Sequence, residues 1–205
     1  MARIARLSLI PLVLALAACG GGSGSKTTGA TKNPCDVRGS HATFPLLSTK
    51  RPHTVGVVTN LGSFEIRLDV ADSPCVTSSF AALVRRNFFD GTVFHRIVPN
   101  FVIQGGDPSG TGTGGPGYTV VEAPPTGSTY TEGVVAMAKA GDEPPGAAGS
   151  QFFVVTAEDA GLPPDYAVLG TVSKGLNVVR RIGAVGSPAT EKPTRRVVVL
   201  RMTVT

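Results

Sequence analysis

Apolar and polar residues alternate in two neighbouring stretches of the chain, which predicts a pair of β-strands. Residues 54–59 (TVGVVT) and 63–68 (SFEIRL) are separated by an Asn-Leu-Gly sequence that favours a turn. In the second stretch Phe64, Ile66 and Leu68 occupy every other position, so their side chains share one face. We therefore expect a hairpin that buries one face.

The next apolar pattern has the spacing of a helix. Asp72 or Ser73 can cap it, and Pro74 suits its first turn. The apolar residues that follow form one stripe: Val76, Phe80, Leu83 and Val84. A shorter pattern of the same kind, formed by Leu176, Val179 and Ile182, predicts a second helix.

Short apolar runs between glycines and prolines predict the remaining strands. These runs lie at residues 92–97, 101–104, 134–138, 152–156, 168–172 and 197–204. In the last run the residues expected to share one face are Val198, Leu200, Met202 and Val204. Residues 105–133, rich in Gly and Pro, read as a long ordered loop.

The expected elements amount to about eight strands and two helices, with no repeat and no alternation of strand and helix. A closed antiparallel barrel is the natural solution, because closure removes exposed sheet edges. We therefore predict a mainly β fold: a closed eight-stranded antiparallel β-barrel capped by two α-helices.

Composition supports a packed domain and argues against nucleic-acid binding. The 205 residues are 41% hydrophobic and 16% charged, which is too apolar for a disordered chain. The formal net charge is +5, but the basic residues are scattered and no run of them interleaves with aromatic residues. We expect a mildly basic surface and no nucleic-acid partner.

The first residues have the layout of an export signal. Residues 1–19 read MARIARLSLIPLVLALAAC, with two early arginines, a short apolar run and a final cysteine. The apolar run is too short for a comfortable membrane span. Residues 16–19 resemble a bacterial lipobox, which implies cleavage before Cys19 and attachment of acyl chains such as palmitate to it. An ordinary signal peptide is the alternative.

This interpretation divides the chain into three parts and places it outside the cytoplasm. Residues 1–18 are the expected lipoprotein signal peptide, 19–52 a lipid-anchored flexible linker and 53–205 the folded domain. The membrane would be contacted through the lipid alone. Disulfides persist in such a compartment, so we expect Cys35 and Cys75 to pair; two isolated thiols are the alternative.

Two segments place long polar side chains among aromatic residues. The first, residues 94–107, reads FHRIVPNFVIQGGD, and the second, residues 149–154, reads GSQFFV. An isolated arginine would usually lie over a core with its charge in solvent. Here His95, Arg96, Gln104 and Gln151 lie among phenylalanines, and polar groups in such surroundings need partners or face a ligand.

The first segment resembles the cyclophilin signature F-H-R-x-I-P-x-F-x-x-Q-G-G-D, with Ile97 and Val98 between Arg96 and Pro99. The second is similar to the family's G-S-Q-F-F. Residues 133–141, GVVAMAKAG, resemble a third family strand. The resemblance runs from about His53 to Thr205 and implies a peptidyl-prolyl cis/trans isomerase that needs no cofactor and no metal.

The resemblance also implies roles for individual residues. Arg96 matches the catalytic arginine, and Gln104 the glutamine that orients it. The remaining implied site residues line the proline pocket or the peptide groove: Phe101, Val102, Phe153 and Leu162 for the pocket, and His95, Ala138, Lys139, Gln151 and Tyr166 for substrate contacts. The implied partners are proline-containing peptides and unfolded exported proteins, and we expect a monomer.

Three positions depart from the family pattern. Gly161 stands where many members carry a tryptophan associated with cyclosporin binding, Lys139 replaces an asparagine, and Tyr166 replaces a histidine. These changes leave open a second interpretation, in which the same fold binds proline segments or unfolded chains without turnover.

Other motifs carry less weight. Residues 110–115, GTGTGG, fit a dinucleotide-binding pattern, but no helix is expected after them. A cysteine hydrolase built on Cys75 with His95 or His53 lacks a nucleophile motif. The three histidines, including His41, lack the spacing of a metal site.

Overall fold

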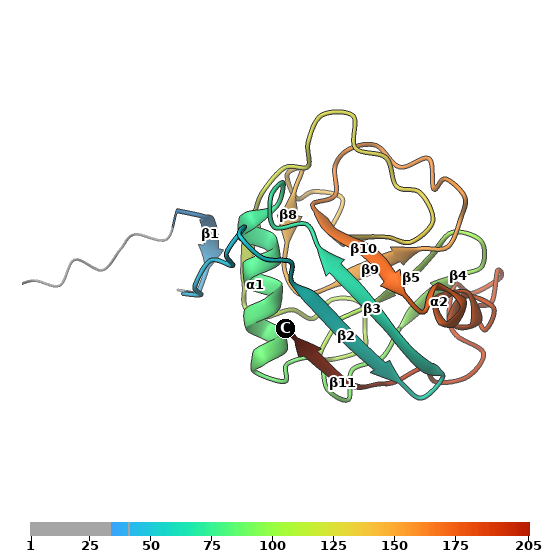
Figure 1. Ribbon diagram of the computed structural model, residues 1–205. Helices are drawn as coiled ribbons and strands as arrows, with labels where there is room; N and C mark the ends of the chain where they lie inside the picture. The colour runs from blue at the N-terminus through green and yellow to red at the C-terminus, as the bar shows by residue number, and fades with distance from the viewer. Residues whose placement is uncertain (1–33, 41) are drawn as a thin grey trace, which may run out of the picture. The chain divides into compact units, whose positions relative to one another are not determined.

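The computed structural model describes residues 34–40 and 42–205 (Figure 1). The expected signal peptide, Cys19 and His41 lie outside the described residues. None of the helices in the described part of the chain is long and apolar enough to cross a membrane.

Eight antiparallel strands form the main sheet, in the order β11-β2-β3-β10-β7-β9-β5-β4. Their bounds are β2 (Thr54–Thr59), β3 (Gly62–Leu68), β4 (Arg96–Val98), β5 (Val102–Gly105), β7 (Val134–Met137), β9 (Phe152–Val155), β10 (Val168–Lys174) and β11 (Val199–Val204). A second sheet of three strands has the order β1-β6-β8, formed by β1 (Asp36–Gly39), β6 (Tyr118–Val121) and β8 (Ala147–Ala148).

Two helices pack against different strands. Helix α1 (Pro74–Arg85) contacts β11 and β6, whereas α2 (Leu176–Gly183) contacts β3, β4 and β5. In Figure 1 α1 lies to the left of the strands and α2 to the right, and the buried side chains of both helices belong to one main core. The expected apolar stripe of α1 is buried, and Phe80 within it packs 4.7 Å from Phe89 and 5.5 Å from Phe152, measured between ring centroids. The hairpin of β2 and β3 buries Phe64, Ile66 and Leu68, as its alternation indicated.

The main sheet is open, so the prediction of a closed barrel is wrong. It curves through 225°, and its edge strands β4 and β11 do not pair along their length. Strand β4 has only three residues, and the backbone N–H of Ile97 donates to the Glu191 carbonyl at 2.8 Å. The loop after α2 therefore occupies the edge that β11 would need. The residues that precede β4, rather than β4 itself, reach the edge at β11: Val93 forms a bridge with Val198, and backbone hydrogen bonds join Gly91 and Thr92 to Val199 and Phe94 to Val197.

The face predicted for the last strand is correct for Met202 and Val204 and wrong for Val198 and Leu200. Val199 and Met202 are buried, whereas Leu200 is 54% exposed. The register shifts between Val199 and Arg201, which pair with the consecutive residues Thr59 and Val58. The extra residue is a β-bulge, and it moves the following side chains to the other face.

Two segments expected to be irregular contain strands. The stretch 105–133 includes β6, and the stretch 34–52, assigned to the flexible linker, includes β1, which pairs with β6 along its whole length. Phe44 and Leu47 from the same stretch are buried in the main core. The linker interpretation is wrong for residues 34–40 and 42–52, because they bury apolar side chains and complete a sheet.

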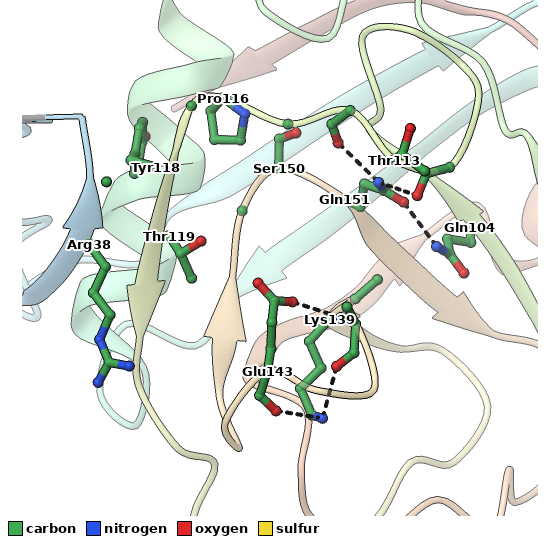
Figure 2. Close-up of a pocket in the computed structure, with 18 residues that line it drawn as sticks. Arg38, Gln104, Thr113, Pro116, Tyr118, Thr119, Lys139, Glu143, Ser150 and Gln151 are labelled. Atoms are coloured by element: carbon green, nitrogen blue, oxygen red, sulfur yellow. Dashed lines mark hydrogen bonds between the residues drawn. The ribbon is translucent and has the colours of Figure 1, made fainter.

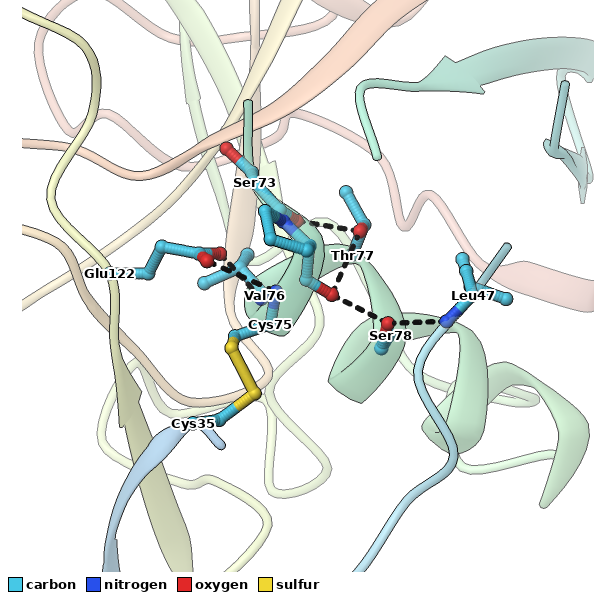
Figure 3. Close-up of a disulfide and its surroundings, with 9 residues drawn as sticks. Cys35, Leu47, Ser73, Cys75, Val76, Thr77, Ser78 and Glu122 are labelled. Carbon is cyan, nitrogen blue, oxygen red and sulfur yellow. Dashed lines mark hydrogen bonds between the residues drawn. A yellow bond between two sulfur atoms is a disulfide. The ribbon is translucent and has the colours of Figure 1, made fainter. Parts of the chain in front are cut away.

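A disulfide joins this N-terminal segment to α1. The Sγ atoms of Cys35 and Cys75 lie 2.03 Å apart, and Cys75 is in the first turn of the helix (Figure 3). Ser73 occupies the N-cap position, but its side chain makes no capping bond. The carboxylate of Glu122, which follows β6, accepts hydrogen bonds from the backbone N–H groups of Cys75 and Val76 at 3.1 and 2.8 Å. An anion at this end also suits the helix dipole.

We predict that Glu122→Ala lowers the free energy of unfolding by about 1–2 kcal/mol, because two N–H groups of α1 lose their acceptor. Urea denaturation of the variant and the parent measures the change. Glu158→Ala removes an exposed carboxylate with no described side-chain bond and serves as the control. A Glu122→Ala variant as stable as this control would contradict the capping role.

Candidate functional site

The site begins with a cross-strand pair of polar residues on the short hairpin of β4 and β5. Arg96 and Gln104 are register partners, and the next pair along, Ile97 and Ile103, is fully buried in the main core. Because side chains alternate along a strand, this core pair directs Arg96 and Gln104 to the outer face of the sheet. Arg96 Nη1 donates to Gln104 Oε1 at 3.5 Å.

The guanidinium of Arg96 is held from a second direction by Glu191. Its Nε lies 2.8 Å from Glu191 Oε2, and both side chains are partly exposed, at 34% and 50%. Exposed ion pairs contribute little to stability. The ion pair therefore serves mainly to orient the guanidinium beside Phe101. The ring centroid of Phe101 lies 5.9 Å from Arg96 Cζ.

A chain of amide hydrogen bonds leads from Gln104 into the glycine-rich loop. Gln104 Nε2 donates to Gln151 Oε1 at 3.0 Å, and Gln151 Nε2 donates to the carbonyls of Gly112 and Gly114, each at 3.0 Å (Figure 2). The amide of Gln151 thereby links the strand that bears Gln104 to the loop.

That loop folds around the buried carboxylate of Asp107. Backbone N–H groups of Ser109, Gly112 and Gly114 donate to its two oxygens at 2.7, 2.6 and 3.1 Å, and Ser109 Oγ donates at 2.7 Å. A Cβ atom added at Gly114 would overlap Asp107 Oδ1, so the loop needs glycine there. These N–H groups are unavailable to a phosphate, and β6 rather than a helix comes next, which contradicts a dinucleotide site.

The hydrogen bonds to Asp107 determine the direction in which the pKa of its carboxyl group shifts. Burial by itself would raise the pKa of this carboxyl group, but the hydrogen bonds donated by Ser109, Gly114 and Gly112 outweigh burial. They hold the pKa of Asp107 well below its ordinary value.

An apolar cluster, separate from the main core, lies next to the polar chain on the outer face of the sheet. Its member Phe153 is the register partner of Gln104. The structure brings together here the four residues expected around a proline ring, which are Phe101, Val102, Phe153 and Leu162. It adds Ala138 and Tyr166, which were expected to contact the substrate elsewhere. The rings of Phe153 and Tyr166 meet edge to face, with centroids 5.4 Å apart.

Tyr130 belongs to this outer apolar cluster and was missed from the sequence. Its hydroxyl donates to the Tyr166 carbonyl at 2.7 Å and accepts from the Tyr166 N–H at 3.0 Å, so it fixes that backbone from both sides. Burial raises the pKa of Tyr130, which keeps the hydroxyl protonated. Neither Tyr130 nor Glu191 lies in a motif that could have identified it.

A groove of about 660 Å³ extends from the polar chain, and Gln104, Ala138, Lys139 and Gln151 all line it. Figure 2 shows its lining residues. The Nζ of Lys139 lies 5.7 Å from the Tyr166 ring centroid, so the groove adjoins the outer apolar cluster.

His95 lies elsewhere, in a separate depression beside Ser109, Lys192 and Arg196. Its Nδ1 is buried without a hydrogen-bond partner among the described residues. Burial lowers the pKa of His95, partly opposed by the charge of Asp107. The structure thus separates His95 from the groove where substrate contacts were expected.

The cysteine-hydrolase interpretation is excluded, because Cys75 is bonded to Cys35. His53 hydrogen-bonds the carbonyls of Ser48 and Thr205 instead of a thiol. Within the described ranges, no three His, Cys, Asp or Glu residues could hold a metal ion together.

Comparison with known proteins identifies the family. The sequence model described as cyclophilin type peptidyl-prolyl cis-trans isomerase matches residues 54–204. The chain belongs to the cyclophilin family. A peptidyl-prolyl cis-trans isomerase-like 1 from Gibberella zeae is 37% identical over 147 residues, which are 70% of this cyclophilin and 89% of that protein. A probable peptidyl-prolyl cis-trans isomerase B from Mycobacterium tuberculosis is 39% identical over 162 residues, covering 67% of this chain and 51% of the relative.

Solved structures agree with this family. A cyclophilin type isomerase from Cryptosporidium parvum superposes with a TM-score of 0.68 and 27% identity, over 76% of this chain and 98% of the other. A second structure of that protein, determined in the presence of the dipeptide Ala-Pro, gives a TM-score of 0.66 and 28% identity over 74% and 98%. The N-terminal segment 34–53 of this cyclophilin lies outside the residues that the family model matches.

We predict that the stability of this cyclophilin falls as the pH drops below about 4, the ordinary pKa of an aspartate. A carboxyl group whose folded-state pKa is lowered stabilises the fold above its unfolded pKa, and this contribution is lost as the pH falls toward the folded pKa. Asp107→Asn should flatten this acid-side decline and cost about 1–3 kcal/mol at neutral pH. Denaturation across pH measures both effects.

Asp142→Asn is the matched control, since Asp142 is exposed and has no described side-chain bond. A decline of equal steepness in Asp107→Asn and in the parent would rule out Asp107 as its source.

Proposed function

We propose that this cyclophilin rotates X–Pro peptide bonds with Arg96 as its catalytic residue. The amide resists rotation because its nitrogen shares a lone pair with the carbonyl, which gives a barrier of about 18–20 kcal/mol. No covalent bond breaks, so the site only has to bind the twisted amide more tightly than the planar one. In the twisted state the nitrogen regains its lone pair and can accept a hydrogen bond.

The placement of the guanidinium of Arg96 carries this proposal. Nε donates a hydrogen bond to Glu191 and Nη1 donates one to Gln104. No described residue accepts a hydrogen bond from Nη2. The group lies beside Phe101, which packs against the outer apolar cluster. A guanidinium is charged at every relevant pH and has fixed geometry. It therefore offers a donor beside the position that a proline ring would take.

The other residues orient Arg96 and bind the substrate. Gln104 orients the guanidinium and contacts the substrate, while Phe101, Phe153 and Leu162 hold the proline ring as the preceding residue turns. The Ala-Pro dipeptide used with the related C. parvum protein supports a proline-containing peptide as the ligand. Every 1.36 kcal/mol of selective stabilisation accelerates rotation about tenfold.

We predict that Arg96→Ala lowers kcat/KM by about 10²–10³-fold, the usual loss when a preorganised donor is removed from a transition state. A protease-coupled assay with a proline peptide measures it, and circular dichroism checks the fold. Arg201→Ala, an exposed arginine on β11, is the control and should keep the activity of the parent.

The same assay tests the binding-module alternative. Equal turnover by Arg96→Ala and the parent would remove Arg96 from catalysis. A parent that suppresses aggregation of unfolded chains but accelerates no prolyl exchange would instead favour binding without catalysis.

We further propose that the protein works outside the cytoplasm, attached to the cell membrane by lipid on Cys19, where it assists the folding of exported proteins. The signal-like residues 1–18 and the lipobox-like residues 16–19 support this. The Cys35–Cys75 disulfide is a second support, since such bonds persist in oxidising compartments.

Mass spectrometry of the mature protein should find its N-terminus at Cys19 with acyl chains attached. Cys19→Ala should leave the membrane fraction, because lipid anchoring depends on buried methylene groups worth about 0.8 kcal/mol each. Ser25→Ala, which leaves the lipobox intact, is the control. A mature N-terminus at any other residue would reject the lipid anchor.

A further inference from the structure

The groove beside the active site has one wall that does not come from the family-matched part of the chain. Arg38 and Gly39 on β1 line it, opposite the wall formed by Gln104, Gln151 and Lys139. Arg38 is the register partner of Thr119 on β6, which also lines the groove. Figure 2 shows Arg38 beside Thr119 at one end of the groove and Gln104 at the other.

This wall is attached firmly to the rest of the fold. Strand β1 pairs with β6 at four positions, and Ser40 adds two hydrogen bonds to the Gly117 carbonyl, at 3.1 Å from its backbone N–H and 2.8 Å from Oγ. At the other end of the strand, the disulfide of Cys35 ties it to α1. Glu122 ties the end of β6 to the same turn of α1. Arg38 therefore has a defined place in the groove.

The charged side chains that line the groove favour an anion. They are Arg38, Lys139 and Glu143. The Glu143 carboxylate is turned to its own loop, where it accepts from the Ala140 N–H at 2.7 Å. The Lys139 Nζ donates to the backbone carbonyls of Ala140 and Glu143 at 3.3 and 3.1 Å, and no carboxylate among the described residues forms an ion pair with it.

Arg38 forms an ion pair with Asp36, and a carboxylate of the substrate could replace Asp36 in it. Its Nη2 lies 2.8 Å from Asp36 Oδ2, and the two side chains are 57% and 51% exposed. An exposed pair of this kind is weak and screened by salt. No described residue accepts a hydrogen bond from Nη1 of Arg38, which leaves a donor for a second carboxylate.

We propose that Arg38 is a specificity-determining residue: it binds the carboxylate of an Asp or Glu near the proline of the client chain. The inference rests on the proposed function, because a peptide that places its proline beside Phe101 and Phe153 passes Gln104 and Gln151 and enters the groove. The preferred substrates are thus proline segments with an acidic residue at one fixed distance from the proline.

The test is a set of X–Pro peptides in which one Glu is moved through the positions on both sides of the proline, each matched by a peptide with Lys in its place. The readout is the ratio of kcat/KM for the Glu and Lys peptides. The full-length parent should prefer Glu at one position by about two- to fivefold, the range expected for an exposed charge pair. Added salt should reduce the preference.

Arg38→Glu should invert the ratio at that position, and Arg38→Ala should bring it closer to one. Arg67→Glu makes the same change of charge at an exposed position of β3 outside the groove, and should keep the ratio of the parent. A ratio in Arg38→Glu equal to that of the parent, or a parent that prefers Glu at no position, overturns the role of Arg38.

These outcomes differ from failure of the proposed function. If the parent turns over the peptides but the ratio does not respond to Arg38, only the specificity role is lost. If the parent accelerates no prolyl exchange in any peptide, the proposed catalysis fails and the inference fails with it.

Discussion

The buried carboxylate of Asp107 is the constraint on which the polar half of the site depends. It has no exposed surface, so its charge must be met by donors inside the protein. The glycine-rich loop meets this need by turning its N–H groups inward. The same turn directs two carbonyls outward to Gln151, whose other amide atom orients Gln104. The position of Arg96 thus depends on a carboxylate that never contacts it.

The main sheet serves two apolar clusters at once. Along β9, Phe152 and Val154 enter the main core, whereas Phe153 and Val155 belong to the outer apolar cluster. Strand β5 divides in the same way, with Ile103 inside and Val102 outside. The alternation of side chains therefore produces a continuous apolar run in the sequence and two separate environments in the fold. An outer apolar surface can be built this way without opening the core.

Local patterns in the sequence predicted the parts of the fold that depend on local spacing. The β2–β3 hairpin and the apolar stripe of α1 follow from periodicity alone, whereas the contact of Arg96 with Gln104 was implied only by the resemblance to cyclophilins. The open edge at β4 could not be predicted, because it depends on a loop about ninety residues further along the chain. Contacts between distant segments also explain why the pairing of β1 with β6 and the cap from Glu122 were missed. Such long-range contacts leave no periodic pattern in the sequence.

The bond between Cys35 and Cys75 also determines what a break in the chain would do. Leu46 is 44% exposed and Ser48 to Arg51 are exposed as well, so a protease can reach this stretch. A cut there would leave residues 34–40 covalently attached to α1 through sulfur, and β1 would stay beside β6. Only a cut combined with reduction would release the piece that carries Arg38. The nicked molecule would therefore keep both walls of its groove.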